Sequence, residues 1–212
     1  MLHTIIIIMS IIFIGLFIWL SMRLFSLLLP ELHMRHRIRK YAQYYLYKEH
    51  YQLLENVCLT SNDGEKILIP QILVSRFGVF VMAFCDARGR IYGNNSISWW
   101  YDRKGAWYHP FDNPHTQMVG LDYLLSDYLQ IPKAMCQTVV VFNERAKFNH
   151  SNYQQTGYLQ DIFHYITEQR LGYLAPEEFC ALIKMLELGQ QGNTSDAKRC
   201  IIETGIIARR PA

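Results

Sequence analysis

The sequence lacks the motifs that most enzyme and metal sites require. Its cysteines, at positions 58, 85, 136, 180 and 200, are odd in number and widely spaced, without a C-x-x-C pair. This spacing indicates neither a disulfide framework nor a zinc site, and free thiols suit a reducing compartment. The chain also has no H-x-x-x-H, H-E-x-x-H, G-x-x-x-x-G-K-[ST], G-x-S-x-G or G-x-G-x-x-G. No motif therefore supports a nucleotide hydrolase or a serine hydrolase.

A large excess of charge is missing as well. The formal net charge is +3, with a pI near 8.5. That is far from the dense positive charge of a dedicated nucleic-acid-binding protein. Much of the excess lies after the N-terminal apolar segment and in Arg209-Arg210, so the remainder of the chain is close to neutral.

What the sequence does have is a long apolar segment at the start. Leu2 to Met22 carries no charged side chain apart from a proton that His3 can bind, and includes the run IIIIMSIIFIGLFIWL. At ~1.5 Å per residue such a helix reaches roughly 31 Å, enough for the hydrocarbon core of a bilayer. We expect one N-terminal transmembrane helix.

The flanks of this segment favour an anchor over a cleaved signal peptide. There is no basic residue before it and no small-x-small cleavage site after it. Arg35, Arg37, Arg39 and Lys40 follow it, so the positive-inside rule places the N-terminus outside and the domain in the cytoplasm, at an inner or plasma membrane. The same basic cluster also suits attraction to anionic lipid or nucleic acid.

The rest of the chain predicts an α/β domain. We expect a juxtamembrane helix over 30–48, an α/β domain over 49–188 and a tail over 189–212, after the anchor over 1–29. The apolar runs 67–75 and 79–85, separated by Arg76-Phe77-Gly78, predict a β-hairpin. Further strands are expected near 57–60, 90–93, Trp99, Trp107 and 137–143, and helices from Asn113 to about Tyr128, over 159–169 and over 177–188.

The hairpin carries a specific pattern. The pattern is I-D-H-(three apolar)-S-P-Y-G-I-F-V-I-E-x-K-N-x-x-G-x-I-x-G. This chain matches it at Ile69, Ser75, Gly78, Phe80, Val81, Gly89, Ile91 and Gly93. Asn113-Pro114-His115-Thr116-Gln117 matches N-P-x-x-Q, and later matches lie at 139–142 and 174–186. Over about residues 41–188 the chain resembles the nuclease-related domain family, NERD.

The resemblance implies a restriction-endonuclease-like mixed β-sheet flanked by helices. Active members are similar to PD-(D/E)xK nucleases, in which an Asp on one strand and an E-x-K pair on the next hold Mg²⁺. Here the Asp position is Pro70, the Glu position is Ala83 and the Lys position is Cys85. Pro70 has no N–H for a sheet ladder and predicts a sheet edge or a bulge.

Neighbouring acids do not replace the lost ones convincingly. Asp86 lies three residues after Ala83, and Glu65 five before Pro70, so each is expected on the opposite face of its strand unless a bulge shifts the register. The acid of the family's first helix has no counterpart in His33-Met34-Arg35-His36-Arg37. We therefore expect no catalysis and no cofactor.

Three functions stay open. The first is a membrane-anchored, catalytically degenerate NERD-like scaffold or binding module, linked by the resemblance to DNA processing or transfer. The second is an active Mg²⁺-dependent nuclease with relocated acids, and the third a structural subunit of a membrane complex. Expected partners are the lipid bilayer, a protein and nucleic acid. The candidate binding residues are Arg76, Arg88, Arg90 and Gln117, the last of which would approach the catalytic edge in active relatives.

Overall fold

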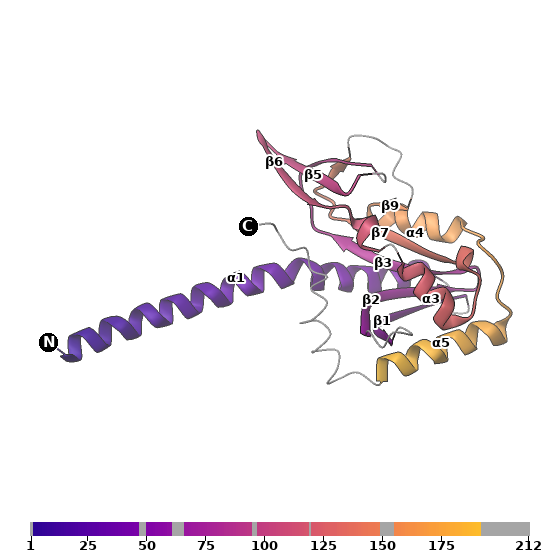
Figure 1. The fold of residues 1–212 in the computed structure, drawn as a ribbon, viewed down its shortest axis with the longest axis horizontal. Helices are drawn as coiled ribbons and strands as arrows, with labels where there is room; N and C mark the ends of the chain where they lie inside the picture. Colours follow the sequence, from indigo (N-terminus) through magenta and orange to yellow (C-terminus); the bar gives the residue numbers. More distant parts are fainter. Residues whose placement is uncertain are drawn as a thin grey trace. The chain divides into compact units, whose positions relative to one another are not determined.

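The computed structural model describes residues 2–46, 50–60, 66–94, 97–118, 120–148 and 155–191. The chain divides into two compact units, residues 1–38 and residues 39–212. All strands belong to the second unit (Figure 1). Of the expected tail, residues 189–191 end the last helix, and residues 192–212 lie outside the described part.

Helix α1 (Leu2–Tyr45) is continuous through the expected boundary between anchor and juxtamembrane helix at residues 29 and 30. Over residues 9–22 its described apolar side chains are exposed, for example Phe13, Phe17 and Trp19. Within the described residues, no helix combines the length and apolar character needed to cross a membrane. The transmembrane helix predicted over 2–22 gains no support from this result, and the side chains of residues 2–8, 10 and 11 in it lie outside the described part.

The larger sheet has five strands in the order β1-β2-β3-β7-β9. Strand β2 (Lys66–Ser75) pairs antiparallel with both β1 (Tyr51–Thr60) and β3 (Gly78–Cys85), whereas β7 (Cys136–Phe142) pairs in parallel with β3 and with β9 (Thr156–Gly157). The predicted hairpin is confirmed as β2 and β3, which are antiparallel up to the pair Ser75–Gly78. The strand expected near 57–60 is longer than predicted.

The smaller sheet was not predicted as a separate layer. It has four strands in the order β6-β5-β4-β8, made of β4 (Arg90–Tyr92), β5 (Trp99–Lys104), β6 (Trp107–Asp112) and β8 (Lys147–Phe148). The expected mixed α/β class is confirmed, and the strands of the single expected sheet are divided between two sheets. Figure 1 shows the β5–β6 hairpin projecting from the larger sheet.

Helices cover the larger sheet. Val57, Ile72, Val79 and Val81 form a buried cluster with apolar side chains of α3 (Leu121–Leu129) and α5 (Pro176–Gln191). Helix α4 (Leu159–Glu168) contacts β7 and β9. A short 3-10 helix, η1 (Lys133–Met135), leads into β7.

The single helix predicted from Asn113 to Tyr128 is wrong. It is divided into α2 (Pro114–Gln117) and α3, and the break falls before Gly120, whose φ is +98°. The start was predicted correctly: the Asn113 side chain accepts a hydrogen bond from the His115 N–H, and Pro114 takes the first helical turn. Such an Asn cap followed by Pro is a typical helix beginning.

Candidate functional site

One face of β3 carries the positions that the resemblance marks as catalytic. Side chains on this face pack in two different apolar clusters along the strand. Val79 and Val81 pack in the large cluster beneath α3 and α5. Two and four residues farther on, Ala83 and Cys85 pack against a second buried cluster made of Ile91, Trp100, Val140, Phe142 and Ala146. This second cluster joins β3 and β7 to the inner face of the smaller sheet, so the end of β3 lies against apolar side chains.

Pro70 lies where two strand ladders are irregular. The β2–β3 ladder ends at the pair Ile72–Val81, and its continued register would set Pro70 opposite Ala83. On the other side the β1–β2 ladder omits the pair between Glu55–Gln71 and Val57–Ile69, where Asn56 has a φ of +54°. Although β2 lies between β1 and β3, its pairing with β3 covers only Ile72–Ser75, so Pro70 lies at a local edge on that side, as predicted. The alternative prediction, a local irregularity of the bulge kind, agrees with this geometry.

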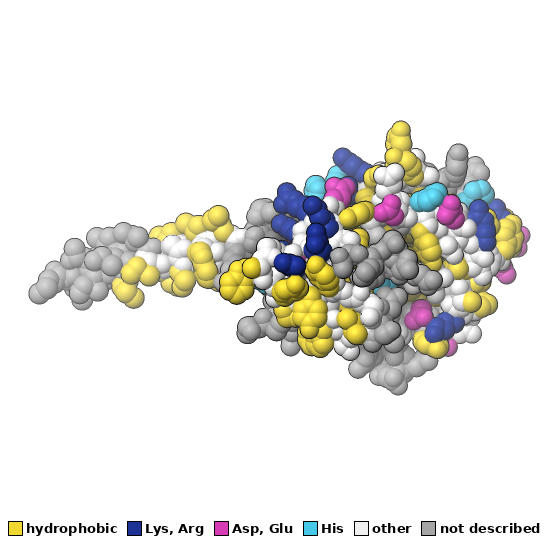
Figure 2. Space-filling view, turned by 90° about the horizontal axis from the view of Figure 1, so that it is seen from above, with side chains coloured by type: hydrophobic (Ala, Val, Ile, Leu, Met, Phe, Trp, Pro, Cys, Tyr) yellow, Lys and Arg dark blue, Asp and Glu magenta, His cyan; other side chains and the backbone are white. Residues whose placement is uncertain are grey.

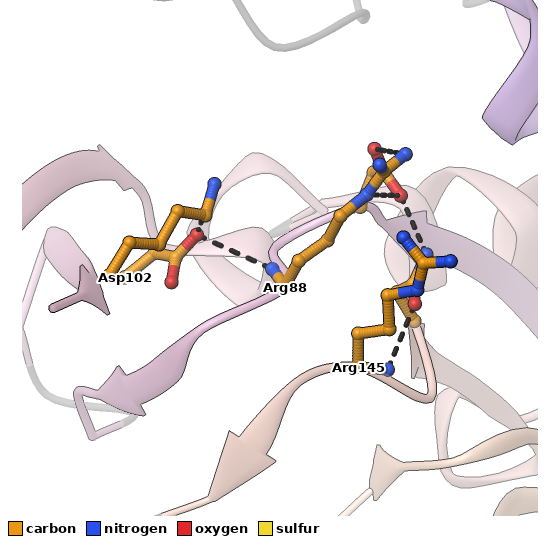
Figure 3. Close-up of polar contacts among 6 residues, drawn as sticks. Arg88, Asp102 and Arg145 are labelled. Atoms are coloured by element: carbon orange, nitrogen blue, oxygen red, sulfur yellow. Dashed lines mark hydrogen bonds and ion pairs between the residues drawn. The ribbon is translucent and has the colours of Figure 1, made fainter.

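A polar cluster lies just past the ends of the parallel strands β3 and β7 (Figure 3). The Asp86 carboxylate accepts hydrogen bonds from Arg88 Nε at 3.1 Å, Arg88 Nη2 at 2.8 Å and Asn143 Nδ2 at 2.8 Å. The Asn143 N–H donates to the Cys85 carbonyl at 3.1 Å, and Asn143 Oδ1 accepts from the Arg145 N–H at 2.9 Å. Asn143 therefore holds the two strand ends together.

Asp102 is a buried carboxylate that the sequence interpretation did not single out. Only 4% of the residue is exposed, and Oδ2 accepts from the Arg88 N–H at 3.3 Å and pairs with Lys104 Nζ at 3.0 Å. Its Oδ1 is buried and makes no hydrogen bond within the described part of the chain. Strand alternation was the available signal, because Asp102 shares the face of Trp100 and that face is buried.

The family of this chain follows from its similarity to a known domain. The model of the nuclease-related domain, NERD, matches residues 32–143, which is more than half of the chain. The protein belongs to the NERD family.

Other comparisons add little. An uncharacterized protein of Bacillus anthracis is 23% identical over 120 residues, which is 53% of this chain and 54% of that protein. The chain thus spans about half the length of this relative. No solved structure matches the chain.

The residues at the metal-binding positions that the resemblance implies do not suit a magnesium ion. Mg²⁺ requires oxygen ligands, and Pro70, Ala83 and Cys85 supply no carboxylate. Burial raises the pKa of the Cys85 thiol to about 12, with Asp86 and Asp102 adding to the rise and a hydrogen bond from the Ala87 backbone opposing it. A thiol in that state is neutral at physiological pH and binds metal poorly. Within the described residues, no three His, Cys, Asp or Glu side chains are grouped closely enough to hold a metal ion.

The glycines of the NERD pattern have a packing role here. A Cβ on Gly89 would lie 2.3 Å from the Arg103 carbonyl oxygen and 2.0 Å from Asp102 Oδ1. A Cβ on Gly93 would lie 2.4 Å from Cγ of the Trp100 indole. Both glycines flank β4, so they allow this strand to lie close against β5 above the buried Trp100.

The structure separates the four predicted binding residues. Arg76, at the hairpin turn, donates to the Tyr173 hydroxyl and to the Leu174 carbonyl, so it joins that turn to the segment before α5. Arg88 and Arg90 lie beyond the opposite end of β3, in the polar cluster and on β4. Gln117 ends α2, and its side chain lies outside the described part.

Proposed function

We propose that this NERD protein is a binding module that does not cleave its ligand, held at a membrane by its N-terminal helix. The proposed lack of cleavage rests on the residues at the catalytic positions that the resemblance implies. Ala83 and Cys85 pack in an apolar cluster, and Pro70 has neither a carboxylate nor an N–H. A hydrolytic site of the family's kind needs two carboxylates and a cation at these places.

The nearby acids support the same proposal because each already has a cation beside it. Arg88 forms an ion pair with Asp86, with 2.8 Å between Nη2 and Oδ2. Lys104 forms one with Asp102. Recruiting either acid to a metal would require breaking an existing pair, and for Asp102 the carboxylate is buried, where an unpaired charge is costly.

The proposed attachment to a membrane rests on the apolar segment over 2–22 and on the exposure of its described side chains. The exposed fractions of Phe13, Phe17 and Trp19 are 70%, 64% and 55%. Exposed apolar surface of this extent is covered in the cell by lipid or by another protein. With Arg35, Arg37, Arg39 and Lys40 after the segment, the domain faces the cytoplasm.

A second function has one observation in its favour. The buried Asp102 Oδ1 without a hydrogen bond in the described residues is the kind of atom that a cation satisfies. An active nuclease with relocated acids would use Asp102 and Asp86 beside the end of β3. Its chemistry would depend on Mg²⁺ or Mn²⁺.

Calorimetric titration of the full chain with Mg²⁺ and with Mn²⁺ tests the two functions. Cleavage of single- and double-stranded DNA is assayed in the same samples, with Asp102→Asn and Asp86→Asn as variants. We expect neither heat of binding nor cutting by the native chain. Metal-dependent cutting that the Asp102→Asn variant loses would overturn the proposal and establish the relocated site.

Membrane attachment is tested separately by fractionating cells that express the full chain or a chain without residues 2–22. We expect the full chain in the membrane fraction after carbonate washing and the shortened chain in the supernatant. Equal distribution of both chains would overturn the anchor and leave the binding module unaffected.

A further inference from the structure

The outer face of the smaller sheet carries basic and aromatic side chains in register. Arg90 on β4 pairs with Arg103 on β5 and with Lys147 on β8, and Arg103 pairs in turn with Tyr108 on β6. Directly paired residues point to the same side of a sheet. A row of three cations and one tyrosine therefore crosses all four strands.

A second row of the same face is aromatic. Tyr92 on β4 pairs with Tyr101 on β5, two residues along from the basic row, and Trp99 follows after two more. The exposed fractions are 42% for Tyr101, 54% for Tyr108 and 48% for Trp99. We define the outer face as Arg90, Tyr92, Trp99, Tyr101, Arg103, Tyr108 and Lys147.

The cations of this face cost stability in the protein alone. Like charges at directly paired positions of neighbouring strands repel one another. Tyrosines partly offset this repulsion. Hydrogen bonds from Arg90 and, to a smaller extent, from Arg103 lower the pKa of the Tyr92 hydroxyl. The Arg103 guanidinium also lies 5.4 Å from the Tyr108 ring centroid. An anion placed over the row would relieve the repulsion further.

Among the described residues of these four strands, one acid shares the face. Asp112 on β6 pairs with Trp99, at the end of the sheet away from the basic row. The basic row itself runs Tyr108, Arg103, Arg90, Lys147 without a carboxylate among its paired positions. Figure 2 shows Lys and Arg side chains gathered beside exposed hydrophobic side chains on part of the surface.

The combination selects one class of partner. Phosphates complement the cations, and the exposed rings offer planar surfaces on which unpaired bases stack. Alternate residues of a strand are about 6.6 Å apart, so Trp99 and Tyr101 can each receive a separate base. A duplex keeps its bases stacked inside and could use only the cations.

We propose that the outer face binds single-stranded nucleic acid, through phosphate contacts to Arg90, Arg103 and Lys147 and base stacking on Trp99, Tyr101 and Tyr108. This names the partner of the binding module and rests on that proposed function. The surface is separate from the NERD catalytic positions, because Ala83 and Cys85 pack against the opposite, inner face of the same sheet.

The test measures fluorescence anisotropy of a labelled twenty-nucleotide single strand with the full chain in detergent micelles and EDTA. EDTA removes metal-dependent cutting, so binding and cleavage are judged independently. One variant carries Arg90→Gln and Arg103→Gln, and another carries Tyr101→Ala and Tyr108→Ala. We expect each to weaken binding at least about tenfold, and the arginine variant to lower the slope of log K against log salt by about 1.4.

Controls remove two cations or one exposed ring elsewhere. The pair Arg170→Gln and Lys184→Gln takes two positive charges from exposed positions outside the sheet, and Tyr123→Ala removes an exposed ring from α3. Both should bind like the native chain, and melting by circular dichroism verifies that every variant is folded. The inference is overturned by absent binding, by equal affinity for a duplex, by unchanged affinity of the tyrosine variant, or by equal losses in the controls. Loss in the arginine variant alone would indicate attraction of any polyanion, an acidic protein included.

Discussion

The two faces of the smaller sheet differ in what covers them. On the inner face, Trp100 is fully buried and stacks on Phe142 with 6.0 Å between ring centroids. On the outer face, its neighbour Trp99 is 48% exposed. The same strand thus supplies one tryptophan that stabilises the fold and another that is available to a partner. An aromatic residue in a strand is informative only when its face is known.

The largest expected effect separates these two tryptophans. Trp100→Ala should lower the free energy of unfolding by about 3–5 kcal/mol, because it leaves a cavity between the two sheets. Trp99→Ala, the matched control, should change it by less than about 0.5 kcal/mol. Urea denaturation of the full chain in detergent measures both, and similar losses would contradict the assignment of the two faces.

The second prediction concerns Asn113, which joins the segment before β5 to the start of α2. Its Nδ2 donates to the Ile97 carbonyl at 2.8 Å while Oδ1 caps α2, and the residue is fully buried. Asn113→Ala should cost about 2–3 kcal/mol through the lost cap and the unpaired carbonyl. Asn113→Asp keeps the cap acceptor and loses the donor. Because a buried carboxylate would face the Ile97 carbonyl, thermal melting should place it no higher than the alanine variant.

Gly93 tests how closely β4 approaches Trp100. Gly93→Ala should cost about 2 kcal/mol, since the added Cβ would overlap the indole and force it to shift. Combining it with Trp100→Phe should cost less than the sum of the two single changes, because the smaller ring leaves room. Chemical denaturation of all four chains gives the coupling, and strict additivity would show that the two positions do not touch.

The smallest effect concerns Cys85, where β3 meets the inner face. Burial raises its pKa in the folded chain to about 12, above the ordinary thiol value of 9.0. The unfolded chain therefore loses the proton first as the pH rises, and stability falls above about pH 9. Between pH 8 and pH 10 the native chain should lose about 1.4 kcal/mol more than Cys85→Ala. Equal losses in the two chains would contradict a half-buried, neutral thiol.

Local features were predictable from the sequence. The hairpin of β2 and β3 follows from two apolar runs around Arg76-Phe77-Gly78, and the helix start from Asn113-Pro114. Turn residues and caps act within a few positions, so their effect can be inferred without the fold. The break between α2 and α3 was missed, because Gly120 lies within an apolar pattern of helical spacing.

The candidate sites were predictable only in part. The substitutions at Pro70, Ala83 and Cys85 are visible in the resemblance, and Arg90 was among the predicted binding residues. Arg103 and Lys147 were not, because pairing across β4, β5 and β8 brings them beside Arg90 from distant parts of the chain. No periodicity within one segment encodes that pairing.

The sequence by itself determined the local elements and the family pattern. Only the tertiary structure decided that the strands divide into two sheets, that Asp102 is buried, and that three cations share a face with exposed aromatic rings. The physical reason is range. Propensity and turn chemistry act between neighbouring residues, whereas burial and strand register depend on side chains from distant segments packing together.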